Sequence, residues 1–487
     1  TGDDGTIKVW NYETCEEIAT MASVGNDEFV IATPDNYYMS SKDALDAVSF
    51  RLNNKLYPFE QFDLKLNRPD IISSRLGKTP QGVVNAYQYI YKKRLRKMGF
   101  TEDQLGDDFH LPEVEIIDKT KTLTTDVSTY KFQVSLLDDK YKLDRLNVYV
   151  NNVPIYGLSG FDLKSLNVSS VKKDVELSLS SGVNKIQVST HNEKGVESLR
   201  ETFKIIYNGE KKKGDLYIVS IGVSNYQNEN FNLKYAAKDA RDVMATVTGK
   251  SAHLYTGIKQ RLLTDEEVNV ENINSLKAFL KNAKPEDAVI IFVAGHGLLD
   301  NNFDYFYATH DIDFNNPRAR GVSYEMLESL LSLTKAYEKL LIMDTCHSGE
   351  LDKEEVEEGK NEDVNLGDVE FRAVGVSVRE KEGFGMENTK ELMDEMFADV
   401  RKGTGATVIS SAGGAEYAME SSEWKNGLFT YCLLEGLTSK KADANRDNEI
   451  NVSEIRSYVY EQVTLLSNGK PKPTARSENL SVDYRIW

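Results

Sequence analysis

The sequence predicts a multidomain chain whose C-terminal part, residues 214–487, is an α/β domain with a parallel sheet flanked by helices, preceded by an all-β sandwich. Three observations support this fold class. The chain has 487 residues, too many for one ordinary hydrophobic core. Residues 112–210 contain short β-branched runs separated by turn residues. From Gly214 onward, strands that are apolar on both faces alternate with helical patterns, as in a parallel sheet covered on both sides.

The composition is that of a globular protein with a large negative charge. Hydrophobic residues make up 40% and charged residues 28% of the chain, and the net charge is −18. Because phosphate binding needs clustered Lys and Arg, we expect no nucleic-acid partner and no anionic membrane surface. The sequence has no apolar run of about 18 residues, no signal-peptide pattern and only three cysteines. We therefore expect a protein of a reducing, cytoplasmic compartment.

The N-terminal residues 1–27 contain two short strand patterns around a turn. Gly5 supplies the turn, Ile7 and Val9 alternate, and Trp10 ends the first strand. This pattern resembles the last strands of a blade in a WD-repeat propeller. One partial blade cannot bury its own apolar face, so we expect it to pack on another part of the molecule.

Two regions connect this segment to the α/β domain. Residues 28–111 form a mixed linker region with a basic helical pattern, YQYIYKKRLRKMGF. At helical spacing we interpret its Lys and Arg residues as a solvated face, and a binding patch is the alternative. Residues 112–210 resemble an immunoglobulin-like sandwich, because their strands recur about every 8–12 residues with Asn and Gly turns. We expect this sandwich to be a spacer.

Two apolar strands of the α/β domain end in reactive residues. AVIIFVAGHG ends at His296 and Gly297, and KLLIMDTCHSG carries Asp344, Cys346 and His347 at its end. In open parallel sheets ligands bind beyond the carboxyl ends of the strands, so we expect these residues to meet at one edge. A thiol becomes a strong nucleophile when a neighbouring imidazole takes its proton. We therefore predict that His296 and Cys346 form a catalytic dyad.

The neighbouring residues complete this prediction. Gly297 lets backbone approach a substrate closely, and its N–H together with that of Cys346 would form an oxyanion hole. His347 is an alternative base, but adjacent residues rarely face each other well enough for proton transfer, so we favour His296. Each residue alone is typical of a strand end or a solvated loop, and only the combination indicates catalysis.

The motifs VAGHG and DTCHSG resemble those of the caspase-like cysteine peptidases, and more closely the metacaspase and bacterial caspase-like branch than animal caspases. His296 and Cys346 are 50 residues apart, and a separation of about 50 is typical of caspases. TVISSAGGAEYAMES and NGLFTYCLLEGL look like small-subunit sequences. The resemblance covers residues 214–487 and implies a large-subunit-like part, an acidic linker and a small-subunit-like part at 214–350, 351–401 and 402–487.

The resemblance also implies a substrate class. Animal caspases cut after Asp, whereas this chain has Asp344 two residues before Cys346 and Asp239 in LKYAAKDA, where metacaspases carry a pocket acid. Two carboxylates would favour Arg or Lys at the cleaved position by charge pairing. We therefore predict an endopeptidase that cuts protein substrates after basic residues and needs no cofactor for its chemistry. For Asp239 the alternative is a carboxylate on a helix surface.

The acidic linker predicts processing. Eight of the fourteen residues from Glu350 to Asp363 are acidic. In caspase-like enzymes this segment joins the two subunit parts and is often cut during activation. The basic residues that we predict as self-cleavage sites are Arg372, Arg379 and Lys381. A solvated loop that is not cut is the alternative.

ADANRDNEINVSE, near the C-terminus, predicts a calcium loop. Positions 1, 3, 5, 7, 9 and 12 of an EF-hand are occupied by Asp443, Asn445, Asp447, Glu449, Asn451 and Glu454. Asn448 stands where Gly is usual, and Asn tolerates the left-handed conformation needed there. We predict that calcium bound through Asp443, Asn445, Asp447, Glu449 and Glu454 regulates the protein. A polar turn without metal is the alternative.

Two other functions stay open. A clostripain-like or gingipain-like peptidase would share the sheet and the basic preference, although CHSG and the small-subunit patterns favour the caspase-like branch. The second is a catalytically silent or tightly gated scaffold that binds an upstream sensor or another partner through the N-terminal β regions. The presence of both His296 and Cys346 speaks against a silent domain.

Overall fold

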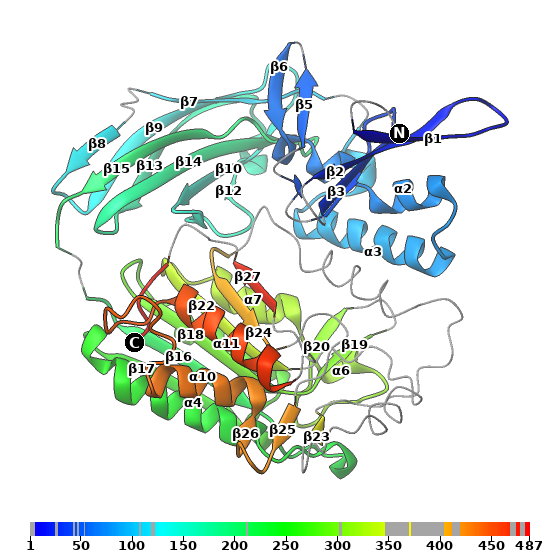
Figure 1. Ribbon diagram of the computed structural model, residues 1–487. Coiled ribbons are helices and arrows are strands. Elements are labelled where there is room, and N and C mark those ends of the chain that lie inside the picture. The colour runs from blue at the N-terminus through cyan, green and yellow to red at the C-terminus, as the bar shows by residue number, and fades with distance from the viewer. Residues whose placement is uncertain are drawn as a thin grey trace.

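The computed structural model places an all-β part and an α/β part side by side (Figure 1), joined through the connection between β15 (Glu201–Tyr207) and β16 (Leu216–Gly222). In the described part of the chain, none of the helices combines the length and the hydropathy needed to span a bilayer. The structure describes residues 5–24, 28–41, 44–45, 48–52, 54–106, 109–117, 122–210, 213–300, 304–345, 370–371, 404–411, 419–467, 474–477 and 483–487.

The α/β domain is built on a six-stranded sheet. The pairs among its first five strands are parallel, and the last strand runs antiparallel to its neighbour. The predicted parallel sheet is therefore confirmed, with one antiparallel edge strand added to it. In spatial order the strands are β17 (Ile258–Thr264), β16 (Leu216–Gly222), β18 (Ala288–Gly295), β22 (Glu338–Thr345), β24 (Thr407–Ser410) and β27 (Thr474–Ser477).

Helices cover both faces of this sheet. Successive strand residues point to opposite faces, so Ile218 and Ile290 enter one core and Val219 and Ile291 the other. This two-sided burial explains why the strands read as continuous apolar runs. The first core is closed by α4 (Ala236–Lys250), α10 (Leu428–Thr438) and α11 (Val452–Leu466), and the second by α5 (Val270–Leu280) and α7 (Tyr324–Ser332).

Two small sheets and several short helices lie around the carboxyl ends of the main strands (Figure 1). One sheet follows β18 directly and consists of β19 (Gly297–Leu299), β20 (Tyr305–Tyr307) and β21 (Val322–Ser323). The other consists of β23 (Glu370–Phe371), β25 (Met419–Ser421) and β26 (Asn426–Gly427). The short helices at this edge are η5 (Glu229–Phe231), η7 (Asp265–Glu267) and α6 (Pro317–Arg320). The short helix η6 (Ser251–Leu254) lies at the opposite edge, where Lys213 Nζ donates to the His253 carbonyl just before β16.

Two sheets between residues 112 and 210 share one hydrophobic core. Val134 and Leu177 come from one sheet, and Val148, Ile186 and Ile205 come from the other. The smaller sheet contains β7 (Glu113–Ile116), β9 (Thr129–Leu137) and β13 (Ser170–Ser178). The larger sheet contains β8 (Thr122–Thr125), β10 (Leu143–Val150), β11 (Val153–Pro154), β12 (Phe161–Asp162), β14 (Gly182–Asn192) and β15, and η4 (Lys164–Leu166) follows β12.

The N-terminal sheet has four antiparallel strands and extends beyond residue 27, the boundary predicted for a partial blade. Ala19 and Ile31 of this sheet pack on Ile72 of a helix, which gives the sheet its apolar partner. The elements of this part are β1 (Thr6–Trp10), β2 (Glu17–Val24), β3 (Glu28–Ala32), β4 (Tyr38–Ser40), β5 (Ser49–Leu52), β6 (Lys55–Pro58), η2 (Phe59–Gln61), α1 (Asp63–Leu66), α2 (Pro69–Leu76), α3 (Gln81–Lys97) and η3 (Glu102–Gln104).

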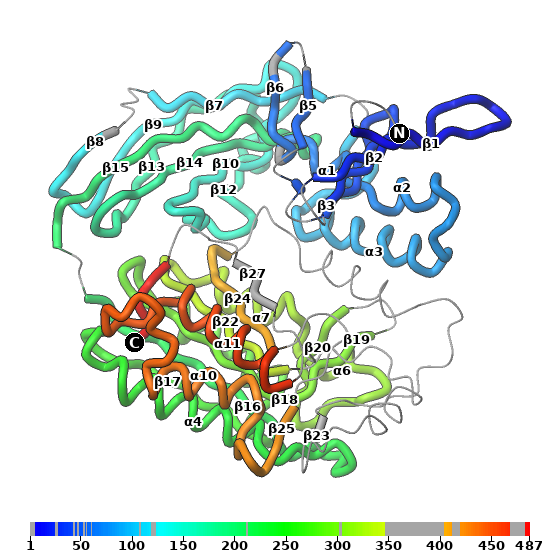
Figure 2. Tube along the Cα trace, in the orientation of Figure 1, coloured from blue at the N-terminus to red at the C-terminus, as the bar shows by residue number. Residues whose placement is uncertain are grey.

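The basic residues of α3 are not all solvated, which corrects the interpretation made from the sequence. Lys93 forms ion pairs with Asp304 (2.6 Å) and Glu325 (2.5 Å), and Lys97 forms one with Glu328 (3.0 Å). All three acids belong to the α/β domain, and Figure 2 shows α3 on the side of the N-terminal part that faces this domain. A helical charge pattern does not reveal which distant acids will face it, so the sequence alone could not identify these ion pairs.

Candidate active site

The strand register brings the two predicted catalytic positions to the same edge of the sheet. β18 and β22 are adjacent and parallel, and Gly295 lies opposite Thr345 at their carboxyl ends. His296 follows Gly295, and Cys346 follows Thr345 in the sequence. Cys346 and the alternative base His347 lie outside the described residues. The structure therefore describes His296, one member of the predicted dyad, and Thr345, the residue before the other member.

Gly295 shows why the strand ends in glycine. Its φ is +147°, and a Cβ there would lie 3.1 Å from the Tyr226 hydroxyl and 3.1 Å from the Tyr307 ring. A side chain at this position would therefore need strained backbone and would collide with two rings. Tyr307 fixes the same turn, because its hydroxyl donates to the carbonyl oxygen of Ala294 at 2.9 Å.

The imidazole of His296 is buried and oriented by backbone. Its Nε2 lies 2.9 Å from the carbonyl oxygen of Phe231, an acceptor, so Nε2 carries the proton and donates it. In the neutral ring Nδ1 is then the basic nitrogen. The backbone N–H of His296 donates to the Tyr226 hydroxyl at 3.0 Å, and the Tyr226 ring lies 5.1 Å from the imidazole. These contacts hold the ring in one orientation.

Residues 223–235, which we call the histidine-orienting loop, supply both contacts to His296. Phe231 stacks on Phe314 with the ring centroids 3.8 Å apart. At the start of the loop, the Asp265 carboxylate accepts from the N–H groups of Ser224 (2.8 Å) and Asn225 (2.9 Å). The role of this loop could not be predicted from the sequence, because its main contribution is a backbone carbonyl, which any residue type can provide. Tyr226, just after β16, is the residue of this loop that contacts His296 through its side chain.

The structure describes Gly297, one of the two residues predicted to form the oxyanion hole. Gly297 begins β19, is buried and lies opposite Tyr307, and the carbonyl oxygen of His296 accepts from Ala308 N–H at 2.9 Å. Gly297 is thus held in a hairpin directly after the predicted base. The second predicted donor, the N–H of Cys346, lies outside the described residues, so the pairing of the two donors stays a prediction.

The two predicted pocket acids converge on the N-terminus of α10. Asp239 and Asp344 are both 0% exposed. Asp239 accepts from Asn426 Nδ2 at 2.8 Å and from the N–H of Gly427, the N-cap of α10, at 3.1 Å. Asp344 Oδ2 accepts from the hydroxyl of Thr430, in the first turn of α10, at 2.6 Å. The positive end of a helix favours such carboxylates. The alternative of a helix-surface role for Asp239 is therefore wrong.

The described cysteines differ from a catalytic nucleophile. Cys432 lies in α10, is 0% exposed and forms no disulfide. Burial, followed by the charges of Glu435 and Asp344, raises the pKa of its thiol to about 12. Cys15 is exposed and free at the turn after β1. Neither lies at the carboxyl edge of the sheet, so Cys346 is the thiol that the sequence places next to His296.

The predicted calcium loop connects α10 to α11. The carboxylate of Asp443 accepts from the N–H groups of Asp447 (3.1 Å) and Asn448 (2.9 Å), so position 1 folds back on positions 5 and 6. Asn448 has a φ of +67°, as expected where Gly is usual. Glu454 forms a capping box with Asn451 at the start of α11. The loop also contains Asn445 and Glu449, and all five predicted ligands lie in the described part of the chain.

No three carboxylate groups of this loop, among the residues that the structure describes, lie within 4.8 Å of one another. Among the described residues, the group whose His and carboxylate atoms all lie within 4.8 Å of one another consists of His110, Asp138 and Asp139, in the N-terminal half. His110 Nδ1 lies 3.0 Å from Asp138 and its Nε2 lies 2.7 Å from Asp139. The two ring nitrogens face different carboxylates, which is not the arrangement of ligands around one metal ion.

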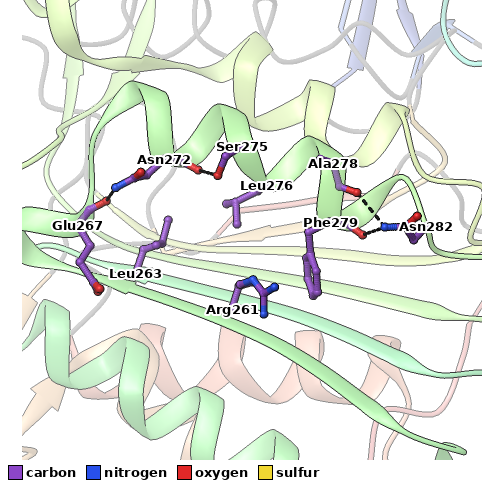
Figure 3. Close-up of a pocket in the computed structure, with 9 residues that line it drawn as sticks. All are labelled: Arg261, Leu263, Glu267, Asn272, Ser275, Leu276, Ala278, Phe279 and Asn282. Carbon is purple, nitrogen blue, oxygen red and sulfur yellow. Dashed lines mark hydrogen bonds between the residues drawn. The ribbon is translucent and has the colours of Figure 1, made fainter.

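A hollow of about 620 Å³ lies between the edge strand β17 and helix α5 (Figure 3). The guanidinium group of Arg261 lies 4.7 Å from the ring centroid of Phe279 in this hollow. None of the residues predicted for catalysis or substrate binding lines it. We therefore do not assign this hollow to the peptidase site.

The predicted self-cleavage sites Arg372, Arg379 and Lys381 lie outside the described residues. The two linker residues that the structure describes form β23, immediately before Arg372 in the sequence. β23 pairs with β25 of the small-subunit-like part, with Glu370 opposite Glu420. The linker is thus attached to the small-subunit-like part through this pair of strands.

The comparisons with known proteins agree with this geometry. The caspase domain family of peptidases matches residues 217–484, so the chain belongs to this family of cysteine peptidases. The resemblance predicted from VAGHG and DTCHSG is confirmed. Peptidases of this family need no cofactor for their chemistry, as the sequence analysis expected. No curated protein sequence matches the chain significantly.

Several solved structures match parts of the chain. Caspase-1 from Spodoptera frugiperda is 12% identical, with a TM-score of 0.33, over 55% of this chain and 89% of that one. A structural-genomics protein from Geobacter sulfurreducens is 15% identical, with a TM-score of 0.37, over 56% of this chain and 93% of that one. Fibronectin(III)-like modules of CbhA from Clostridium thermocellum are 14% identical, with a TM-score of 0.16, over 20% of this chain and 100% of that one.

Proposed function

We propose that the chain is an endopeptidase in which His296 and Cys346 form the catalytic dyad. The observation that carries this proposal is the pairing of Gly295 with Thr345 together with the bond from His296 Nε2 to the Phe231 carbonyl. This bond makes Nδ1 the basic nitrogen. Cys346 is one residue beyond Thr345, and consecutive Cα atoms are about 3.8 Å apart. A neighbouring thiol at that edge is the partner that a basic imidazole nitrogen can deprotonate.

The chemical steps follow from these positions. Nδ1 of His296 takes the thiol proton of Cys346, and the thiolate attacks the carbonyl carbon of the scissile peptide bond. The N–H groups of Gly297 and Cys346 stabilise the oxyanion. The imidazolium then protonates the leaving amine, and water hydrolyses the thioester. The Phe231 carbonyl stabilises the imidazolium throughout, because it accepts the second ring N–H.

The proposed specificity is for Arg or Lys at the cleaved position. It is supported by the positions of Asp239 and Asp344, whose carboxylates converge on the start of α10 next to the end of β22. A guanidinium or ammonium group of the substrate would pair with these carboxylates, whereas a substrate Asp would meet like charge. The substrates would be proteins or peptides with an accessible basic residue.

Three further features complete the proposal. Processing in the linker at Arg372, Arg379 or Lys381 would separate the two subunit-like parts. Calcium at the loop from Asp443 to Glu454 would act on α10, the helix that binds both pocket acids. Residues 1–27, 28–111 and 112–210 would be a blade-like segment, a linker region and a spacer that receive a sensor or scaffold partner. A cytoplasmic, reducing location would keep the thiol of Cys346 free.

Hydrolysis of fluorogenic peptides tests this function. The panel compares peptides ending in Arg, Lys and Asp, with and without calcium, using the wild type, Cys346→Ala and His296→Ala. We expect cleavage after Arg and Lys and a loss of about 1,000-fold or more in both variants. Activity that survives in Cys346→Ala would reject the nucleophile, and preference for Asp would reject the pocket. A folded wild type that cleaves none of the peptides would favour the scaffold function.

A further inference from the structure

We propose that Glu420 is a positioning residue of the peptidase site, and that it links the strand β23 of the linker to the orientation of His296. This inference rests on the proposed function. Glu420 lies on β25, in the small-subunit-like part, and is 1% exposed although it is ionisable. A carboxylate buried to this degree needs charged or hydrogen-bonding partners, so its contacts show what it holds.

Glu420 forms two hydrogen bonds with the histidine-orienting loop. Oε1 accepts from the N–H of Lys234 at 2.8 Å, and Oε2 accepts from the N–H of Tyr235 at 3.3 Å. Hydrogen bonds to an ionised acceptor are stronger than neutral ones. Tyr235 is the N-cap of α4, so these two bonds fix the point at which the loop becomes a helix.

This attachment point is close to the group that orients His296. Phe231, whose carbonyl accepts from His296 Nε2, is three residues before Lys234. The intervening segment is tied back to the start of the loop, because Leu233 N–H donates to the Ser224 carbonyl at 2.8 Å. A shift at Lys234 and Tyr235 is therefore transmitted to the Phe231 carbonyl through a short, closed piece of backbone.

The loop is held by two carboxylates from different parts of the domain. Asp265, which fixes the start of the loop, belongs to the large-subunit-like part. Glu420 fixes its end and comes from beyond the linker. The orientation of His296 thus depends on how the two parts are assembled, because one of the two attachments crosses between them.

The linker strand reaches this attachment through β25. β25 is the middle strand of its small sheet: Glu420 lies opposite Glu370 of β23 on one side and opposite Gly427 of β26 on the other. Gly427 is also the backbone donor to Asp239. Glu420 therefore lies between the linker and two parts of the site, the loop that orients the base and the helix end that holds a pocket acid.

Arg372, one of the proposed self-cleavage sites, follows β23 directly in the sequence. A cut after Arg372 leaves Glu370, Phe371 and Arg372 at the new C-terminus, on the linker segment that follows the large-subunit-like part. The pairing of β23 with β25 can then hold Glu420 in place after the covalent connection is broken. The two hydrogen bonds from Glu420 to the histidine-orienting loop are the means by which an intact or cut linker affects the orientation of His296.

The test compares Glu420→Gln with Glu423→Gln in the full chain. Glu423 is exposed in the turn between β25 and β26, and it is the matched control. For Glu420→Gln we expect kcat to fall about 10- to 100-fold with KM changed less than about threefold, because the base is displaced while the pocket remains. Glu423→Gln should behave as the wild type. Equal kcat values for all three proteins would overturn the proposal.

Two readouts do not depend on peptidase activity. Hydrogen exchange at the amides of Lys234 and Tyr235 should become faster in Glu420→Gln and stay slow in Glu423→Gln. In protein labelled with ¹⁵N-histidine, the signal of the Nε2-protonated His296 ring should be perturbed only in Glu420→Gln. Unchanged exchange and an unchanged ring signal would overturn the proposal even if the wild type proves inactive, whereas inactivity alone would count only against the proposed function.

A second variant covers the outcome in which Glu420→Gln does not fold. Phe371→Pro leaves Glu420 intact and disrupts β23, because proline is incompatible with regular strand pairing. We expect it to lower kcat and to speed amide exchange at Lys234 and Tyr235 in the same direction as Glu420→Gln. Wild-type kcat and exchange in a folded Phe371→Pro protein would overturn the role of the linker strand.

Discussion

The Nζ of Lys93 in α3 lies 2.6 Å from Oδ1 of Asp304, the residue just before β20. The second oxygen of Asp304 accepts from the hydroxyl of Tyr89 at 2.6 Å and from Arg318 at 2.6 Å. β20 pairs with β19, which begins at Gly297, one residue after the predicted base. A helix of the N-terminal part is therefore attached to the hairpin that follows the predicted catalytic histidine.

Replacing Lys93 tests the strength of this attachment. Lys93→Met keeps the aliphatic stem but removes the cation, so the buried Asp304 and the partly exposed Glu325 each lose a charged partner. We expect the free energy of unfolding to fall by about 1–3 kcal/mol. Lys92→Met, on the exposed side of the same helix, should change it by less than about 0.5 kcal/mol. Denaturant unfolding of both variants measures the difference, and equal stabilities would contradict it.

The same pair predicts a pH dependence. Burial raises the pKa of Asp304, but the hydrogen bonds from Lys93 and Tyr89 outweigh it and hold this pKa below its usual value. Burial lowers the pKa of Lys93, but Glu325 and Asp304 outweigh it and raise this pKa. The lowered pKa of Asp304 means that this carboxylate stabilises the fold above its unfolded pKa, and that this stabilisation is lost as pH falls through the folded pKa. The raised pKa of Lys93 means that its ammonium group stabilises the fold below its unfolded pKa, and that this stabilisation is lost as pH rises through the folded pKa.

We therefore expect a constant penalty for Lys93→Met across neutral pH. The penalty should shrink as pH falls from about 4 through the lowered pKa of Asp304, and as pH rises from about 10 through the raised pKa of Lys93. Urea unfolding at several pH values checks this window. A penalty that stays the same at about pH 3 would show that the charge on Asp304 is not its source.

Alkylation distinguishes the three cysteines. Burial raises the pKa of Cys432 to about 12 and removes it from solvent, so iodoacetamide should not modify it in the folded protein. Cys346 should react fastest, and His296→Ala should slow its reaction by about tenfold or more at neutral pH. Mass spectrometry of the labelled peptides gives the rates. Cys432→Ser, the control, should keep full peptidase activity, and rapid labelling of Cys432 would contradict its assignment as an inert thiol.

The bond from Thr430 to Asp344 predicts an effect on substrate binding. Thr430→Val keeps the shape of the side chain but removes the hydroxyl donor at 2.6 Å from a fully buried carboxylate. We expect a stability loss of about 1–3 kcal/mol and a KM for Arg peptides that is raised about 3- to 30-fold. Thr430→Ser should restore both. Thr438→Val, at the exposed C-terminal end of α10, is the control, and an unchanged KM in Thr430→Val would separate Asp344 from the pocket.

Parts of the structure that depend on local pattern could be predicted from the sequence. The strands that end at Gly295 and Thr345 were visible because both faces are buried, which makes the runs continuously apolar. His296 stood out because a strand of this kind ends in a reactive side chain between glycines. The turn at Asn448 was visible because few residue types adopt a left-handed conformation.

Parts that depend on contacts between distant segments could not be predicted. The carbonyl of Phe231 orients His296, but a carbonyl is present in every residue. Glu420 is one acid among many in an acidic chain, and its burial follows only from the fold. Lys93 lies in a helix that reads as amphipathic, and its partner Asp304 is 211 residues away. Long-range pairing of charges leaves no periodic pattern in the sequence.

The calcium loop gives the final prediction. Asp443 and Glu454 stand at positions 1 and 12, and the loop is braced by its middle, where the N–H of Ile450 donates to the Trp487 carbonyl at 3.2 Å and Arg485 pairs with Glu449 at 2.5 Å. Because this brace orders the loop before any ion arrives, a single hand can bind without a second one. We expect calcium at about 1 mM to raise the Tm of the wild type, since a ligand that binds only the folded state stabilises it.

The matched variants separate ligation from loop geometry. Asp443→Asn combined with Glu454→Gln should abolish the heat of calcium binding in calorimetry and the calcium-dependent rise in Tm. Asn448→Gly should keep both, because Gly adopts the φ of +67° found at this position without strain. Magnesium should give a smaller effect, since it requires a stricter octahedral geometry. No heat from the wild type at about 1 mM calcium would leave the loop as a polar turn, and an identical Tm response in the double variant would place the calcium elsewhere.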